Sequence, residues 1–219
     1  DIHLFIPLWK VLAVAVALGV AFPLFFFGTA PIKVMMSASL CAWVLLSITR
    51  DVYLKVRTAK QGVFAGFGRL SRSYYGMQLA HLGLVVTVIG VTLTSNYSVE
   101  KDVRLGMNDR VQVGNYQFEW QGVREYKGAN FEAIQAKIEV FKDNKSIEHL
   151  YPEKRLYVVQ NRSMTEAAID GGLFRDLYVA IGEPLENNQW AVRVYYKPFV
   201  RWLWLGALVM AFGGVVAMS

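Results

Sequence analysis

Four long apolar runs, more than any motif, limit what this 219-residue chain can fold into. A helix needs about 20 apolar residues to cross the hydrocarbon core of a bilayer. Runs of roughly this length lie at about 11–28, 32–49 and 74–95, and a fourth occupies 198–219. Apolar residues make up 54% of the chain, more than an ordinary soluble protein contains. We therefore expect four transmembrane helices, the first two joined by a tight GTAP turn into a hairpin over 1–49.

The interval from 96 to 197 has a different character. It contains 14 basic and 15 acidic residues, and apolar and polar residues alternate in VQVGNYQFEW, AIQAKIEVF and WAVRVYY. Such alternation is typical of half-buried strands. KDNKS, GMND and ENNQ are turn signals, whereas MTEAAIDGGLFRDLYVAIG lacks alternation and is expected to hold a helical turn ended by Gly171–Gly172. The interval is thus predicted to be a small, mostly β domain of five to seven strands, either a barrel or a sandwich.

The segment 50–73 sets the expected orientation of the spans. It is strongly basic, with a single acid, Asp51, against Arg50, Lys55, Arg57, Lys60, Arg69 and Arg72. A basic loop between apolar spans remains in the cytoplasm, so we expect no nucleic-acid partner. The β domain is then expected on the opposite side of the membrane from this loop. The last helix crosses back to the side of the loop, with Pro198 in its first turn, where a missing N–H costs nothing.

Two further features bound the function. The single cysteine, Cys41, excludes an intrachain disulfide, and no cluster of Cys, His and carboxylates has zinc spacing. The chain begins at Asp1 without a methionine and stops at Ser219 inside an apolar run. We expect a piece of a longer polypeptide, with a truncated last helix.

His81 lies within the third apolar run, GMQLAHLGLVVTVIG. At about 100° per residue, Gly76, Gly83 and Gly90 share one face of the helix, flanked by Ala80 and Thr87. Small residues let a neighbouring helix approach closely. His81 points the opposite way, and its expected neighbours are Met77, Leu84, Val85 and Val88.

An ionisable residue inside a membrane is a candidate functional residue by default, because lipid tails offer it no hydrogen-bond partner. Three interpretations are open from the residues alone. His81 is a neutral imidazole that joins helices by a hydrogen bond, a member of a proton relay, or an axial ligand of a haem iron. The relay is disfavoured because the other expected spans contain no Asp or Glu.

Several stretches resemble one known family. GMQLAHLGLVVTVIG, SNYSVEKDVRL, MTEAAIDGGLFRDLYVAIGE and WAVRVYYKPFVRWLWLGAL are similar to the C-terminal third of the CcmF family, and the sibling NrfE type shares much of this pattern. These proteins are cytochrome c haem lyase subunits of the bacterial inner membrane. The resemblance implies that the β domain is periplasmic and that loop 50–73 is cytoplasmic.

The same resemblance implies a cofactor and partners. The family carries a haem b in the membrane that takes electrons from quinol, and His81 matches the histidine of the family's G-M-x-x-A-H-x-G motif, an axial ligand. Counted from residue 74, His81 is about 10 Å along the helix, so the haem is expected in the cytoplasmic half. The expected partners are the rest of the same polypeptide, a subunit that holds apocytochrome c, a periplasmic haem chaperone and apocytochrome c itself.

Other family features have no match in this chain. The Trp-rich segment that binds the transient haem substrate, its two flanking histidines and the second axial histidine are all missing, so we expect no catalytic residue here. His3 falls on the cytoplasmic side in the expected topology, and His149 is interpreted as a surface or packing residue. The alternative function is a non-catalytic, membrane-anchored interaction module, with His81 as a hydrogen-bond link between helices.

Overall fold

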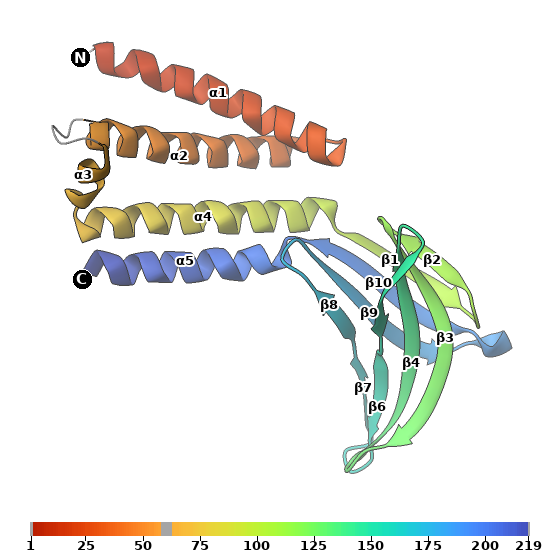
Figure 1. Ribbon diagram of the computed structural model, residues 1–219. Helices are drawn as coiled ribbons and strands as arrows, with labels where there is room; N and C mark the ends of the chain where they lie inside the picture. Colours follow the sequence, from red (N-terminus) through yellow and green to blue (C-terminus); the bar gives the residue numbers. More distant parts are fainter. Residues whose placement is uncertain (1, 58–62, 219) are drawn as a thin grey trace. The chain divides into compact units, whose positions relative to one another are not determined.

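The computed structural model describes residues 2–57 and 63–218, and the chain divides into two compact units (Figure 1). The helical unit covers Asp1–Asn96 and Phe199–Ser219, and the second unit covers Tyr97–Pro198. Lys60 of the expected basic loop lies outside the described residues, as does the side chain of His3.

Apolar helices dominate the helical unit. Stretches long and apolar enough to cross a membrane lie in four of them, which confirms the expected number within the described residues. The helices are α1 (Ile2–Phe27), α2 (Ile32–Arg57), α3 (Val63–Gly68), α4 (Arg72–Tyr97) and α5 (Val200–Met218).

Two helix boundaries differ from those expected. Helix α2 continues past residue 49 to Arg57, and its apolar stretch, Ile32–Val56, includes Asp51. The expectation that the other spans lack a carboxylate is therefore wrong for α2. An apolar window ends where charges begin, but backbone hydrogen bonding continues through residues that favour helix. The short helix α3 also replaces part of the expected loop.

The start of α5 is the second difference. Pro198 is the last residue of a strand, Phe199 has a φ of +57°, and the helix begins only at Val200. The expected place of Pro198 in the first helical turn is therefore wrong. Proline lacks a backbone N–H. That lack is tolerated at the end of a strand, as it is in the first turn of a helix.

Helices α1 and α2 form the predicted hairpin. Helix α1 ends in a left-handed glycine, Gly28, with φ +68°, whose N–H donates to Leu24 O at 3.1 Å. Glycine is favoured at such a helix end because it has no Cβ to clash. Farther along, Gly19 lies so close to α2 that a Cβ would stand 2.4 Å from Ser39 N.

Helices α4 and α5 pack antiparallel through glycines. A Cβ on Gly83 would lie 2.6 Å from Gly206 O, and one on Gly76 would lie 2.5 Å from Gly213 O. The contact is reciprocal, since a Cβ on Gly206 would meet Gly83 O at 2.5 Å. The predicted small-residue face of α4 is thus confirmed, and glycines of α5 complete it.

The second unit is a sandwich of two antiparallel sheets. One sheet has the order β1-β10-β9-β8, and the other has the order β2-β3-β4-β6-β7 with β5 paired to β4. The strands are β1 (Val99–Leu105), β2 (Arg110–Val113), β3 (Tyr116–Lys127), β4 (Phe131–Lys142), β5 (Lys145–Leu150), β6 (Glu153–Tyr157), β7 (Arg162–Glu166), β8 (Ala168–Gly171), β9 (Arg175–Pro184) and β10 (Trp190–Pro198).

The core lies between these sheets. Alternate residues of β3 and β9 are buried, including Phe118 and Leu177, which have no exposed surface. Trp120 of β3 stacks on Trp190 of β10 with ring centroids 6.2 Å apart, and so joins the two sheets. The apolar residues that alternate in the sequence are therefore those that face the other sheet. The sandwich is one of the two predicted architectures.

The predicted turns are observed, but the number of strands and one element differ. Asp143 and Asn144 of KDNKS have φ of +51° and +60° between β4 and β5, as a tight hairpin turn requires. The structure contains ten strands among the described residues, not five to seven, because several are only four to six residues long. The expected helical turn before Gly171–Gly172 is wrong, because that stretch forms β7, β8 and β9. Its alternation is hidden because β7 and β8 lie at sheet edges with mostly exposed or half-buried residues.

Candidate functional site

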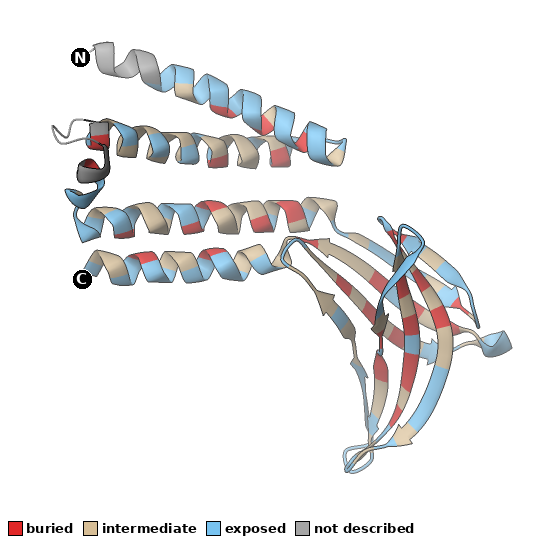
Figure 2. Ribbon diagram, in the orientation of Figure 1, coloured by how far each residue is buried: buried red, intermediate tan, exposed pale blue. Residues whose placement is uncertain are grey.

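Buried and exposed residues alternate in bands along α4 (Figure 2). His81 is one of the exposed residues. Met77 and Leu84, one turn away on either side, are 43% and 49% exposed. Val85, one turn after His81, is buried at 4%, and its carbonyl oxygen lies 4.0 Å from Cys41 Sγ of α2. Among the described residues, α2 and α5 thus cover two sides of α4, and the side that carries His81 stays exposed.

One hydrogen bond orients the imidazole. His81 Nδ1 lies 2.8 Å from the carbonyl oxygen of Met77, one turn earlier in the same helix. Because a carbonyl can only accept, Nδ1 is the donor in this contact, and in the neutral imidazole the lone pair is then on Nε2. Metal-bound histidines commonly donate their other N–H to a carbonyl in this way, which fixes the tautomer and the ring plane.

This arrangement fits half of a haem site with two axial histidines. In the neutral form the imidazole offers one nitrogen donor beside the apolar side chains of Met77 and Leu84, as an axial haem ligand requires. Among the described residues no group of three or more His, Cys, Asp or Glu could hold a metal ion. A metal at His81 would therefore need further donors, either from the haem macrocycle or from beyond this chain.

His81 does not link two helices within the described part of the chain, where its hydrogen bond stays inside α4. The interpretation as a link between helices therefore has no partner here. His149 lies half-buried on β5 opposite Glu139, far in sequence from the spans.

A polar cluster that the sequence analysis missed lies between α2 and α4. Tyr74 Oη donates to Asp51 Oδ2 at 2.7 Å, and Gln78 Nε2 donates to the same oxygen at 3.4 Å. Lys55 Nζ lies 3.4 Å from this oxygen and 4.0 Å from the centre of the Tyr74 ring. The available signal was the spacing Tyr74, Gln78, His81, which places the three residues within about 60° on one side of a helix.

The position of this cluster marks one end of the bundle. Helix α4 has 26 residues, which corresponds to about 39 Å. His81 is therefore about 14 Å from the start at Arg72, and the Asp51 cluster lies between them. His81 therefore lies in the half of the helix nearest the basic segment.

An apolar cavity of about 390 Å³ opens between the helices at another level. Apart from hydroxyl groups, its lining offers only one polar atom with metal affinity, the sulfur of Cys41. Its α4 residues are Ile89, Thr92 and Leu93, two turns or more beyond His81. The cavity is consequently not the site where His81 would hold a ligand.

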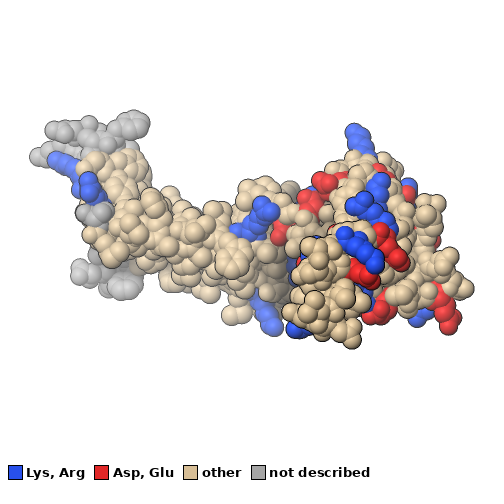
Figure 3. All heavy atoms as spheres, turned by 90° about the horizontal axis from the view of Figure 1, so that it is seen from below, with Lys and Arg blue, Asp and Glu red and all other residues tan. Residues whose placement is uncertain are grey.

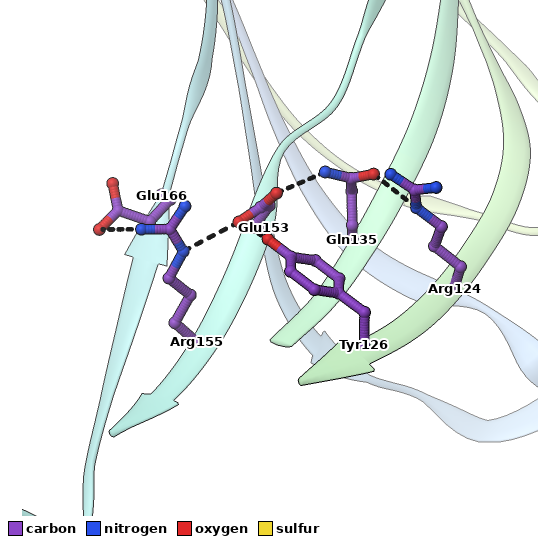
Figure 4. A network of polar contacts seen from close by, with 6 residues as sticks. All are labelled: Arg124, Tyr126, Gln135, Glu153, Arg155 and Glu166. Atoms are coloured by element: carbon purple, nitrogen blue, oxygen red, sulfur yellow. Dashed lines mark hydrogen bonds and ion pairs between the residues drawn. The ribbon is translucent and has the colours of Figure 1, made fainter. Parts of the chain in front are cut away.

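The sandwich carries a polar network centred on two buried polar side chains, Gln135 and Glu153 (Figure 4). Tyr126 Oη and Arg155 Nε donate to Glu153 Oε2 at 2.8 and 2.9 Å, and Gln135 donates to the other carboxylate oxygen. Burial alone would raise the pKa of Glu153, but these hydrogen bonds outweigh it and hold the pKa below its usual range. Arg124 and Glu166 extend the network at its two ends. Every group has a partner, so the network stabilises neighbouring strands and offers no free acid or base.

Charged side chains of both signs lie together on the sandwich (Figure 3). Examples are the ion pairs of Arg110 with Glu119 and of Arg193 with Asp102. Such a mixed surface has no strong preference for a partner of one charge.

The fold defines a class of protein before any comparison. Four apolar helices with a β-sandwich between the third and the fourth describe a membrane protein that carries one folded domain on a helical anchor. The buried glycine contacts and the histidine within a span agree with this class.

Comparison with known proteins identifies the family. Residues 96–198 match the family described as the CcmF C-terminal beta-sandwich. The chain is 49% identical over 96% of its length to the cytochrome c-type biogenesis protein CcmF of Pseudomonas aeruginosa, and 44% identical over 84% to that of Escherichia coli. A NrfE protein of Haemophilus influenzae is 36% identical over 81% of the chain. The chain therefore belongs to the CcmF family, whose members named here are called cytochrome c-type biogenesis proteins. The four apolar helices and these relatives together indicate an integral membrane protein.

A solved structure has the same fold. The chain superimposes with a TM-score of 0.74 over 95% of its length on a structure titled Cytochrome c Heme Lyase CcmF, at 19% identity. The chain spans about a third of that protein, and 32% and 27% of the Pseudomonas and Escherichia relatives.

Proposed function

We propose that this chain supplies one axial ligand, His81, to a haem b inside the bacterial inner membrane, as part of a haem lyase that attaches haem to apocytochrome c. The observation that carries the proposal is the oriented imidazole, with Nδ1 2.8 Å from Met77 O, on an exposed face of α4 beside Met77 and Leu84. The similarity to CcmF proteins supports the lyase, and the second ligand belongs to the rest of the polypeptide.

The residues of this chain would orient the iron ligand. The hydrogen bond to Met77 selects the tautomer, and the glycine contacts with α5 leave the His81 face available to a further helix. The haem supplies a redox centre, with electrons from quinol. We expect thioether formation elsewhere in the complex, because the family's Trp-rich segment and its flanking histidines have no match in this chain.

Orientation follows from the charges. The basic segment 50–73 is placed in the cytoplasm by the positive-inside rule, and the sandwich then lies in the periplasm. The haem would then occupy the half of the membrane near the cytoplasm, a proposal that the position of His81 toward the Arg72 end of α4 supports. The periplasmic partners would be apocytochrome c, the subunit that holds it and the haem chaperone.

An optical spectrum of the full-length protein tests the ligand. We expect His81→Ala to remove the reduced b-type bands and His81→Gly with added imidazole to restore them, because exogenous imidazole can occupy the vacated position. His149→Ala is the matched control, since it removes a histidine outside the spans. Unchanged bands in His81→Ala would refute the assignment.

A second function, docking of periplasmic partners by the sandwich, is supported by its exposed apolar residues, such as Val159 at 91% and Ile169 at 60%. Deletion of residues 100–195 should abolish co-purification with the partners and leave haem b bound. Normal co-purification would contradict docking without affecting the ligand proposal.

A further inference from the structure

The hairpin between β8 and β9 carries two neighbouring apolar side chains at its tip. Leu173 and Phe174 are 52% and 59% exposed, although most residues of comparable size in the sandwich core are fully covered. Nothing in the proposed haem function uses them. Adjacent exposed apolar residues on a short turn suggest a surface that is covered in the working protein.

The tip is held firmly rather than loosely. Gly172 N–H donates to Arg175 O at 2.8 Å and to Asp176 Oδ1 at 3.1 Å. Arg175 forms an ion pair with Asp170 across the base of the turn. These contacts close the hairpin on both strands, so the two apolar side chains project from a rigid support.

The strand register places this tip at one particular end of the sandwich. Arg175, the first residue of β9, pairs with Pro198, the last residue of β10. Phe174 and Leu173 therefore extend beyond that pair, in the direction in which the chain leaves the sandwich. Helix α5 begins two residues later, at Val200.

The other covalent connection leaves from the same end. Val99, at the start of β1, pairs with Tyr196 of β10, and helix α4 ends two residues earlier, at Tyr97. Both membrane helices that border the sandwich thus join it beside the β8–β9 tip. The first turns of α5 contain Arg201, Trp202 and Trp204, residue types that concentrate at membrane interfaces.

We propose that Leu173 and Phe174 form a membrane-contacting tip, which inserts into the interface of the lipid bilayer and holds the sandwich against it. The occupant of this surface is lipid. An adjacent Leu-Phe pair on a closed turn forms an apolar wedge of the kind that interfacial anchors insert into a bilayer.

The opposite end of the sandwich provides a matched control. The turn between β6 and β7 carries Val159, which is 91% exposed. Strands β7 and β8 follow one another along the chain, so this turn lies at the far end from the β8–β9 tip (Figure 1). Val159 is apolar, like Leu173 and Phe174, and it is more exposed than either. We nevertheless expect it to remain in water.

The test measures how deeply a fluorescent label at the tip lies in the bilayer. The full-length protein is reconstituted in vesicles of phosphatidylcholine and phosphatidylglycerol. Leu173→Cys and Val159→Cys, each with Cys41→Ala, would be labelled with a nitrobenzoxadiazole maleimide. Quenching by nitroxide lipids labelled near the headgroup is compared with quenching by aqueous iodide. An interfacial tip is buried about 5–10 Å into the headgroup boundary, so lipid quenching at 173 should exceed that at 159 by at least ~2-fold, with iodide quenching lower.

Two outcomes would overturn the proposal. Equal iodide quenching at both positions, without lipid quenching, would mean that the tip remains in water. Protection of position 173 from both quenchers would mean that protein, not lipid, covers it. Because the labelled side chain is itself apolar, Phe174→Ser is added to the Leu173→Cys variant, and its lipid quenching should fall.

Discussion

The glycine contact between α4 and α5 gives the sharpest test of the packing. In Gly83→Ala the new Cβ would stand 2.6 Å from both Gly206 O and Met210 N. Both obstacles are backbone atoms, so no side chain can turn away. Ordinary contact begins near 3.4 Å, so the two helices must separate by several tenths of an ångström or more over the whole crossing.

The magnitude follows from overpacking a close contact. Inserting a methyl group into a well-packed site costs about 1–3 kcal/mol. Against this, replacing a helical glycine with alanine gains about 1 kcal/mol of helix propensity. We expect a net loss of up to ~2 kcal/mol in the free energy of unfolding for Gly83→Ala.

Gly214→Ala is the matched control, because nothing lies within 4 Å of a Cβ at that position of α5. It should keep the propensity gain without the clash, so the two variants should differ by about 1–3 kcal/mol. Reversible denaturation of the purified full-length protein in mixed micelles measures both. Equal stabilities of the two variants would refute the close packing of α4 on α5.

Three further predictions concern other parts of the chain. Trp190→Ala removes the ring that stacks on Trp120 between the sheets and should cost about 3–5 kcal/mol of unfolding free energy in chemical denaturation; a loss below about 1 kcal/mol would mean that the inter-sheet core is elsewhere. The pKa of Glu153 is depressed in the folded state, so its stabilisation is present above its unfolded pKa near 4.5 and is lost as the pH falls through the lower folded value. Glu153→Gln should therefore flatten the acid limb of stability against pH, and an identical limb in both proteins would contradict the network. Tyr74→Phe removes the donor to Asp51 and should cost about 0.5–1.5 kcal/mol; a double variant with Asp51→Asn that shows additive losses would exclude the contact.

Some elements could be predicted from the sequence because their cause is local. A run of about 20 apolar residues needs no partner to specify a spanning helix, and Asp143–Asn144 favours a tight turn wherever it occurs. The glycine face of α4 was predictable for the same reason, since three glycines seven residues apart share one side of any helix.

Other elements depended on distant partners. The stretch before Gly171–Gly172 forms the edge strands β7 and β8, whose mostly exposed residues show no alternation. Their pairing with β6 and β9, respectively, makes them strands. The Asp51 cluster joins residues 23 and 27 positions apart, and a window that ends an apolar span at residue 49 cannot place Asp51 in a helix beside Tyr74.

For the candidate site, the sequence by itself determined that a histidine lies in a span opposite a glycine face, because helical periodicity is a property of consecutive residues. Only the tertiary structure decided which side of α4 stays open, and that the tip at Leu173 and Phe174 lies beside Pro198. Those features arise from packing and strand pairing between segments far apart in the chain, where the free energy of contact outweighs any local preference.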